Sequence, residues 1–277
     1  MKDIYAKTGY LGLLLGATAL LYWPVFVWMN QRFFETNSYY SHGWLLGGAI
    51  IFLLWRSREE ILASPVRPER KGLFFILPGI FLLLAGRLTG INFLAGWSFP
   101  VVLLGISFLN WGRERTRLIL GPLLLLFLMI PLPGIWIIAI SFRLKLLSTS
   151  LGVAAARLAG IQIIRNGFEL VLPAAPAGEN LKIGAACSGL RSLLAFAALG
   201  GFFACLLPLS PIRRGEIFLA ALLLAPLSNL IRVVSLIILR RSLGPVILSG
   251  PWHLLLGGAI FLICFLFFLQ VLRWRMR

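Results

Sequence analysis

The chain has 277 residues, of which 60% are hydrophobic and only 13% are charged, and its formal net charge is +17. This composition leaves too little polar surface for a soluble domain of this length. The chain is therefore predicted to be a polytopic membrane protein. The 26 basic residues lie in short clusters between apolar runs. That pattern is typical of membrane topology, so the lipid bilayer is the expected partner and no nucleic acid is expected.

Eight apolar runs predict an all-α polytopic membrane protein with about eight transmembrane helices, in a single integral-membrane domain over residues 1–277. The first run, Tyr10–Met29, is about 20 residues long, enough to cross a ~30 Å hydrocarbon layer at ~1.5 Å per residue. The others are a run ending at Trp55, Leu73–Leu88, Ile91–Leu109, Leu118–Ile140, Leu190–Leu207, Glu216–Leu239 and Leu254–Leu272. The fifth of these spans is interrupted by Pro131-Leu132-Pro133-Gly134. Thr89-Gly90 predicts a tight turn between the third and fourth spans, and a basic loop is expected over Trp111–Arg117.

The connector over residues 141–186 predicts a small cap outside the membrane. Ser141–Ala159 mixes basic residues with Leu and Ala, which favours an amphipathic or partly inserted helix. Asn166-Gly167 separates two apolar runs within Ile161–Leu172, and this pattern predicts a β-hairpin between spans five and six.

Charge predicts the orientation of the spans. With eight spans both termini lie on one side, and the connectors on that side carry fifteen basic residues against nine on the other. The positive-inside rule therefore predicts cytoplasmic termini. The hairpin, Cys187 and both histidines, His42 and His253, then face outward.

Cys187 is the first candidate for chemistry. It lies in Ala186-Cys187-Ser188-Gly189-Leu190-Arg191, where a polar segment gives way to an apolar helix. A helix N-terminus and a nearby cation both lower the pKa of a thiol, so this position favours a nucleophilic thiolate; the alternative is a small apolar residue at a helix start. Ser188 is expected to cap the helix and Arg191 to tune or gate the site. The three cysteines form no CxxC and no Cys/His pair at metal spacing, so no metal or cofactor is expected.

Arg232 lies inside the seventh span. An arginine in the bilayer centre costs about 2.5 to 3.5 kcal/mol on insertion scales, so it is expected to face the bundle interior or a polar cavity. About 16 residues separate it from Glu216, or ~24 Å of helix, which places it in the outer part of the membrane on the side of Cys187. Snorkelling to the outer interface is the alternative.

His253 begins the eighth span on the same side. A histidine can act as acid and base near neutral pH. Cysteine as nucleophile, histidine as proton donor and arginine as anion stabiliser would suffice for acyl transfer through a thioester. His42 also faces outward in this topology, and the sequence does not separate the two histidines.

These motifs resemble the exosortase/archaeosortase family of membrane cysteine transpeptidases. The segment Ala186–Ser192 is similar to the family's nucleophile motif, Asn229–Val233 to its Asn-x-x-Arg-Val motif, and Trp252-His253 to its histidine segment. Two further segments, Tyr40-Ser41-His42-Gly43-Trp44 and Ile130-Pro131-Leu132-Pro133, also resemble the family, so the similarity spans nearly the whole chain.

The resemblance implies a function. Cys187 would attack a peptide bond in a C-terminal sorting signal, Arg232 would stabilise the oxyanion, and His253 would be the general acid/base. Asn229, in the arginine motif, is a secondary candidate beside His42, Ser188 and Arg191. The implied substrates are membrane-anchored exported proteins with signals of the PEP-CTERM kind, associated with extracellular polysaccharide, at a bacterial inner membrane.

A transporter or polysaccharide-export subunit is the alternative function. An arginine within a span and proline-broken helices are common in transporters. Against it, the sequence has no internal repeat and no acidic residue within a span beyond Glu216 at one edge.

Overall fold

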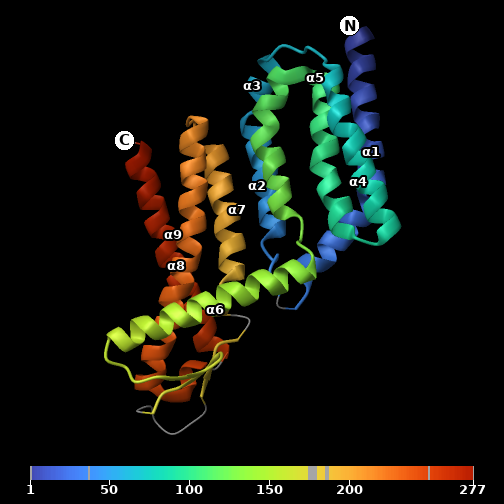
Figure 1. Ribbon diagram of the computed structural model, residues 1–277. Helices are drawn as coiled ribbons and strands as arrows, with labels where there is room; N and C mark the ends of the chain where they lie inside the picture. The colour runs from blue at the N-terminus through green and yellow to red at the C-terminus, as the bar shows by residue number, and fades with distance from the viewer. Residues whose placement is uncertain (1, 37, 174–179, 185–186, 249, 277) are drawn as a thin grey trace. The chain divides into compact units, whose positions relative to one another are not determined.

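The computed structural model of the chain describes residues 2–36, 38–173, 180–184, 187–248 and 250–276 (Figure 1). The chain packs as two compact units, Met1–Leu132 and Pro133–Arg277, and each is described by itself. The single domain predicted over residues 1–277 stays a prediction.

The first unit is helical throughout its regular structure. Its elements are α1 (Lys2–Phe34), α2 (Gly43–Arg56), α3 (Arg58–Ala63), η1 (Arg70–Gly72), α4 (Leu73–Thr89) and α5 (Asn92–Met129). Gly90 ends α4 with φ of 70°, a left-handed conformation that glycine adopts at no steric cost. The predicted tight turn at Thr89-Gly90 is confirmed.

The helix α5 is two helices joined at Gly112. This glycine has φ of 79° and ψ of −173°, outside the helical region, so the chain reverses there (Figure 1). The basic loop predicted over Trp111–Arg117 is therefore wrong in length. One glycine turns the chain, and the residues from Arg113 onward already belong to the second helix.

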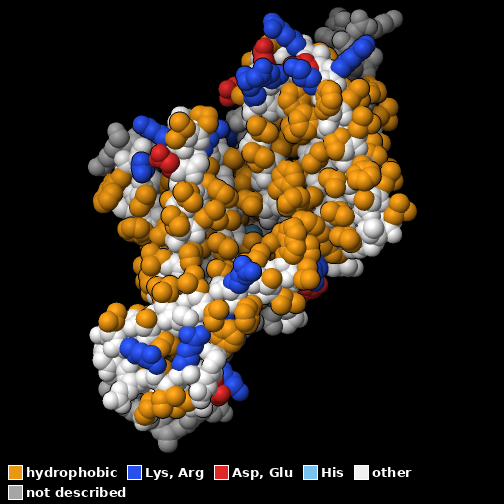
Figure 2. All heavy atoms as spheres, viewed as in Figure 1, with side chains coloured by type: hydrophobic (Ala, Val, Ile, Leu, Met, Phe, Trp, Pro, Cys, Tyr) orange, Lys and Arg blue, Asp and Glu red, His pale blue; other side chains and the backbone are white. Residues whose placement is uncertain are grey.

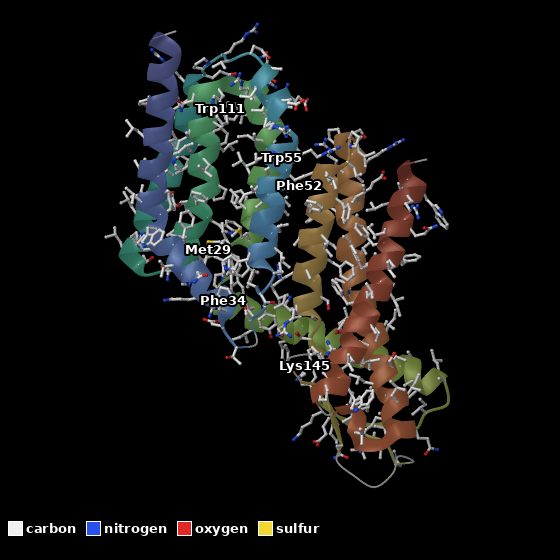
Figure 3. The ribbon with its side chains drawn as sticks, turned by 180° about the vertical axis from the view of Figure 1, so that it is seen from behind. Met29, Phe34, Phe52, Trp55, Trp111 and Lys145 are labelled. Carbon is white, nitrogen blue, oxygen red and sulfur yellow. The ribbon has the colours of Figure 1, made fainter. Side chains whose placement is uncertain are left out.

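Two basic connectors meet at one end of the first unit. The backbone N–H of Arg67 donates to the carbonyl of Trp111 at 3.1 Å, and that of Arg113 donates to Glu69 Oε1 at 3.0 Å. Lys and Arg side chains gather at this end while hydrophobic side chains cover the helices (Figure 2), and Trp111 and Trp55 lie near it (Figure 3). The two connectors share a side, as the topology requires; which side faces the cytoplasm stays a prediction.

The second unit begins with one long helix over Gly134–Leu158, where the sequence predicted the end of the fifth span followed by a separate helix over Ser141–Ala159. Its elements are α6 (Gly134–Leu158), β1 (Ile164–Asn166), β2 (Glu169–Val171), β3 (Leu181–Lys182), α7 (Leu190–Leu206), α8 (Pro211–Leu243), η3 (Gly244–Leu248) and α9 (Gly250–Met276). The fifth span was predicted over Leu118–Ile140 with an interruption at Pro131-Leu132-Pro133-Gly134. The helix ends before this interruption, at Met129, because a residue before proline is disfavoured in the α region, and Ile130 is extended with ψ of 123°.

The three strands form a small antiparallel sheet in the order β1-β2-β3. Ile164 faces Val171 and Asn166 faces Glu169, with Gly167 in the turn at φ of 64°, so the chain forms a β-hairpin around Asn166-Gly167. Its predicted place between spans five and six stays a prediction. The third strand was not predicted. The sheet packs on the C-terminal part of α8 through a buried core of Leu170, Leu181, Leu236 and Ile237.

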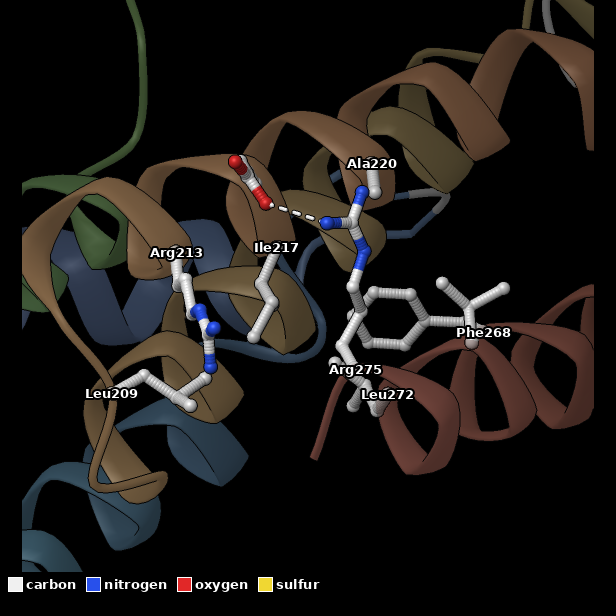
Figure 4. Close-up of a pocket in the computed structure, with 9 residues that line it drawn as sticks. Leu209, Arg213, Ile217, Ala220, Phe268, Leu272 and Arg275 are labelled. Atoms are coloured by element: carbon white, nitrogen blue, oxygen red, sulfur yellow. Dashed lines mark ion pairs between the residues drawn. The ribbon is translucent and has the colours of Figure 1, made fainter. Parts of the chain in front are cut away.

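Helices α8 and α9 lie side by side and antiparallel. Glu216 near the start of α8 forms an ion pair with Arg275 near the end of α9, with Oε2 and Nη1 3.1 Å apart (Figure 4). The beginning of α9 therefore lies beside the C-terminal half of α8. That arrangement brings the neighbourhood of His253 to Arg232.

Six helical segments within the described residues are long and apolar enough to cross a membrane, judged by length and composition. They span residues 12–34, 70–89, 92–129, 134–158, 211–240 and 250–275, and α2 and α7 are shorter apolar helices. The multi-pass, mainly helical architecture is thus confirmed. Helix α6 lies across α7 and α8 (Figure 1), and the count of eight spans stays a prediction.

Candidate active site

Cys187 lies between the sheet and α7. Its side chain is 4% exposed and packs in one core with Ile183 from the end of the cap and Val233 of α8. Its backbone N–H donates to the carbonyl of Gly184 at 3.1 Å. The thiol is therefore held by packing on both sides.

A left-handed glycine turns the chain from Cys187 into α7. Gly189 has φ of 81° and is the first flanking residue of the helix. A Cβ at this position would lie 2.8 Å from Cγ of Asn229, closer than side-chain carbons approach, so the site requires glycine. The expected cap by Ser188 is wrong. The N-cap position of α7 is Gly189, which has no side chain to cap the helix. Ser188 Oγ accepts only a long hydrogen bond, 3.4 Å, from the backbone N–H of Leu190.

Asn229 joins the cysteine segment to α6 and α8. Its Nδ2 donates to the carbonyl of Cys187 at 3.0 Å and to Ser148 Oγ at 2.7 Å. The side chain is 2% exposed, and hydrogen bonds made in a low-dielectric interior are strong and orienting. Asn229 therefore fixes the backbone of the cysteine from the helix that also carries Arg232, one turn further on.

Arg232 and His253 meet Cys187 at a single nitrogen atom. His253 Nε2 lies 3.6 Å from Cys187 Sγ and 2.7 Å from Arg232 Nη2. A guanidinium is a donor only, so Nε2 accepts from it and the imidazole proton resides on Nδ1. A thiol and a guanidinium, carried by different parts of the second unit, thus both lie within hydrogen-bond reach of one imidazole nitrogen, a geometry that covalent catalysis requires.

Gly257 makes room for the arginine. It lies one turn after His253 on α9, and a Cβ there would lie 2.9 Å from Cζ of Arg232 and 3.2 Å from Nη2. The next residue, Gly258, has open space at the same position. The guanidinium therefore rests against the bare backbone of α9.

Burial opposes ionisation of the thiol. Burial raises the pKa of Cys187 above its ordinary value, while the positive charges of Arg232 and Lys145 lower it less strongly. The sequence predicted a lowered pKa from the helix start and a cation. The cation is present, but desolvation outweighs it in this arrangement.

The hydrogen bonds of this cluster do not include two of the sequence candidates, His42 and Arg191. His42 belongs to the first unit, where it precedes α2 and its ring stacks on Tyr40 with centroids 6.1 Å apart. Burial lowers the pKa of His42, and its Nε2 has no hydrogen-bond partner within the described part of the chain. Arg191 is exposed on the first turn of α7, and its role in tuning or gating stays a prediction.

Sequence reasoning missed two members of the site. Ser148 binds Asn229 from α6, and Gly257 accommodates Arg232. The available signals in the sequence were the Ser148-Thr149-Ser150 run within a leucine-rich stretch and the Gly-Gly pair one turn after His253. Among the described residues, no three His, Cys, Asp or Glu side chains are grouped as metal ligands.

The sequence matches the family model of the transmembrane exosortase, Exosortase_EpsH, over residues 28–270. The chain belongs to the transmembrane exosortase family. No curated protein and no solved structure matches it. The exosortase match includes Cys187, Arg232 and His253 together with the Tyr40 and Pro131 segments. Those two segments also meet in the first unit, since the N–H of Leu132 donates to Tyr40 Oη at 3.1 Å.

Proposed function

We propose that this exosortase is a membrane-embedded cysteine protease/transpeptidase that cleaves C-terminal sorting signals of exported proteins through a thioester. The observation that carries the proposal is the approach of His253 Nε2 to both Cys187 Sγ and Arg232 Nη2, at 3.6 and 2.7 Å. Nucleophile and base within reach, with the base oriented by a third group, is the arrangement of covalent acyl transfer.

The proposed reaction has two steps. His253 Nε2 takes the proton of the Cys187 thiol as Sγ bonds to the carbonyl carbon of the scissile peptide. The carbon–nitrogen bond then breaks, the leaving amine receives the proton from His253, and a thioester remains on Cys187. Water, or an amine or lipid acceptor, releases the acyl group. Arg232 stabilises the oxyanion that forms on the way.

The shared nitrogen gives this sequence an order. While Arg232 donates to Nε2, the lone pair that must take the thiol proton is occupied. A substrate carbonyl in the site offers the guanidinium a second acceptor. As Arg232 turns to that oxygen, Nε2 becomes free for the thiol, so substrate binding and activation of Cys187 are coupled.

The proposed substrates carry a short motif, a transmembrane helix and a basic tail, as in signals of the PEP-CTERM kind associated with extracellular polysaccharide. The enzyme would work at the outer face of a bacterial inner membrane with both termini in the cytoplasm. Docking the substrate helix beside α7 and α8 would hold the scissile bond at Cys187, which supplies much of the rate enhancement.

Co-expression with a sorting-signal protein tests the proposal. The native enzyme should shorten the substrate, and Cys187→Ala should leave it at full length on an immunoblot. Cys205→Ala is the matched control, because Cys205 is a thiol within α7 away from the polar cluster and should retain processing. Shortened substrate with Cys187→Ala would refute the nucleophile assignment.

A further inference from the structure

A cavity of about 260 Å³ lies beside the cysteine segment, between α6, α7 and α8. Ser188 and Gly189, the two residues after Cys187, form part of its wall. The remainder is mainly leucine, from α6 (Leu144, Leu147, Leu151), α7 (Leu193) and α8 (Leu227, Leu230). The cavity is therefore apolar and adjoins the nucleophile.

The wall contributed by α6 is one face of that helix. Leu144, Leu147 and Leu151 are spaced at three and four residues, so they project from the same side. Leu147 and Leu151 are 50% and 45% exposed although they line a cavity, so this face is covered only in part. Their exposure leaves apolar surface available to a ligand.

The cavity extends from Ser188 and Gly189 along the apolar helices α7 and α8. Leu193 lies one turn inside α7 from Gly189, and Leu227 precedes Arg232 by five residues, or ~7.5 Å of helix. A sorting signal runs from its cleavage motif into its transmembrane helix. The part of such a chain that reaches this cavity is therefore the part that follows the scissile bond.

One buried polar atom beside the cavity lacks a donor. Asn229 lines the cavity, and both bonds of its amide nitrogen, to Cys187 and Ser148, fix the orientation of the amide. Its Oδ1 is buried and has no hydrogen-bond partner within the described residues. A buried acceptor without a donor destabilises the folded protein, and a backbone N–H of a bound peptide would supply the missing donor.

We infer that this cavity is a specificity subsite for an apolar side chain of the substrate on the carboxyl side of the scissile bond. Asn229 Oδ1 accepts a backbone N–H of the same segment. The inference rests on the proposed function, because it deepens the description of that substrate. A lipid acyl chain also fits an apolar cavity, but it offers no N–H to Asn229.

Two neighbouring leucines of α6 give a matched test. Leu147 lines the cavity and Leu146, 43% exposed, does not. Full-length enzyme carrying Leu147→Trp or Leu146→Trp is co-expressed with sorting-signal proteins that bear Ala, Leu or Phe at each of the first three positions after the scissile bond. Processing rates are measured by immunoblot, and alkylation of Cys187 in each variant reports whether the nucleophile is undisturbed.

Leu147→Trp should fill the cavity. It is expected to lower processing of the Leu and Phe substrates by about tenfold relative to the Ala substrate at one position, since a hydrophobic pocket discriminates 10- to 200-fold per methylene. Leu146→Trp should keep the native preference. An equal loss for all three substrates, or an unchanged preference, would overturn the inference. Loss of a co-purified lipid from Leu147→Trp with an unchanged size preference would likewise overturn it and assign the cavity to lipid. Processing of substrate by Cys187→Ala would refute the proposed function itself, and that outcome is independent of the size preference measured here.

Discussion

The two histidines of the chain occupy opposite kinds of surroundings. His42, in the first unit, stacks on Tyr40, and its buried Nε2 has no partner within the described residues. His253, in the second unit, presents Nε2 to a thiol at 3.6 Å and to a guanidinium at 2.7 Å. Either histidine could be the base by residue type. Within the described residues, His253 has a thiol and a guanidinium beside it in its own unit, and His42 has neither a thiol nor a guanidinium among the contacts described.

The same contrast appears in other buried polar groups of the two units. In the first unit, Tyr22 Oη pairs with Ser98 Oγ at 2.8 Å and Ser107 Oγ with Thr116 Oγ1 at 2.7 Å. Such pairs satisfy buried groups and fix helix packing. In the second unit, buried Asn229 bonds both Ser148 and the backbone of Cys187, so this polar pair supports the cysteine segment.

Replacing each histidine gives the largest expected contrast. His253→Ala removes the proton acceptor, so processing of a sorting-signal protein should fall about 10²- to 10⁴-fold. His42→Ala should change processing much less, because the proposal gives His42 no proton to transfer. The rates are compared by pulse-labelling at equal enzyme abundance. Intact processing in the first variant with loss in the second would reverse the assignment.

Substitution of Gly257 or Gly258, two neighbouring glycines near His253, should give a smaller difference in processing rate. Gly257→Ala places a methyl group where the guanidinium of Arg232 rests, so Arg232 must shift and processing should fall about 10- to 100-fold. Gly258→Ala adds the same methyl group in open space and should leave the rate near native. Equal rates for the two variants would show that the position of Arg232 does not matter.

The pH dependence of thiol reactivity gives the smallest expected effect. Burial raises the pKa of Cys187, so its thiolate fraction at neutral pH is below that of an ordinary thiol, and alkylation should accelerate as pH rises. Arg232 lowers this pKa, so Arg232→Gln should raise it and move the alkylation profile to higher pH. Iodoacetamide labelling followed by mass spectrometry measures the profile. A shift to lower pH would contradict the proximity of the two charges.

Hydrophobic runs predicted the helices, and turn residues predicted the hairpin and the Thr89-Gly90 turn. Failures occurred where one residue decides between a loop and a kink. At Gly112 a single residue with positive φ replaced a predicted loop. At Ile130 the following proline ended the helix, whereas the prediction treated the prolines as an interruption within one span that ran to Ile140. Hydropathy reflects which segments avoid water, and it contains almost no information on such a local change of backbone conformation.

The candidate site was predicted in its residues and not in its geometry. Motif resemblance selected Cys187, Arg232 and His253, and their convergence needed the antiparallel pairing of α8 and α9. The hydrogen bond between Asn229 and Ser148 joins residues that are 81 positions apart in the sequence, and no local sequence pattern predicts such a contact. The raised thiol pKa likewise depends on packing of the cap over Cys187.

The thioester on Cys187 is the central claim, and trapping it is the most direct measurement. Purified enzyme is mixed with a sorting-signal substrate, quenched in acid, digested and analysed by mass spectrometry. We expect an adduct in which the N-terminal part of the substrate is attached to the peptide that contains Cys187. Hydroxylamine treatment should remove this adduct, and Cys187→Ala should not form it. Processed substrate with no adduct under single-turnover conditions, or an adduct on another residue, would contradict it.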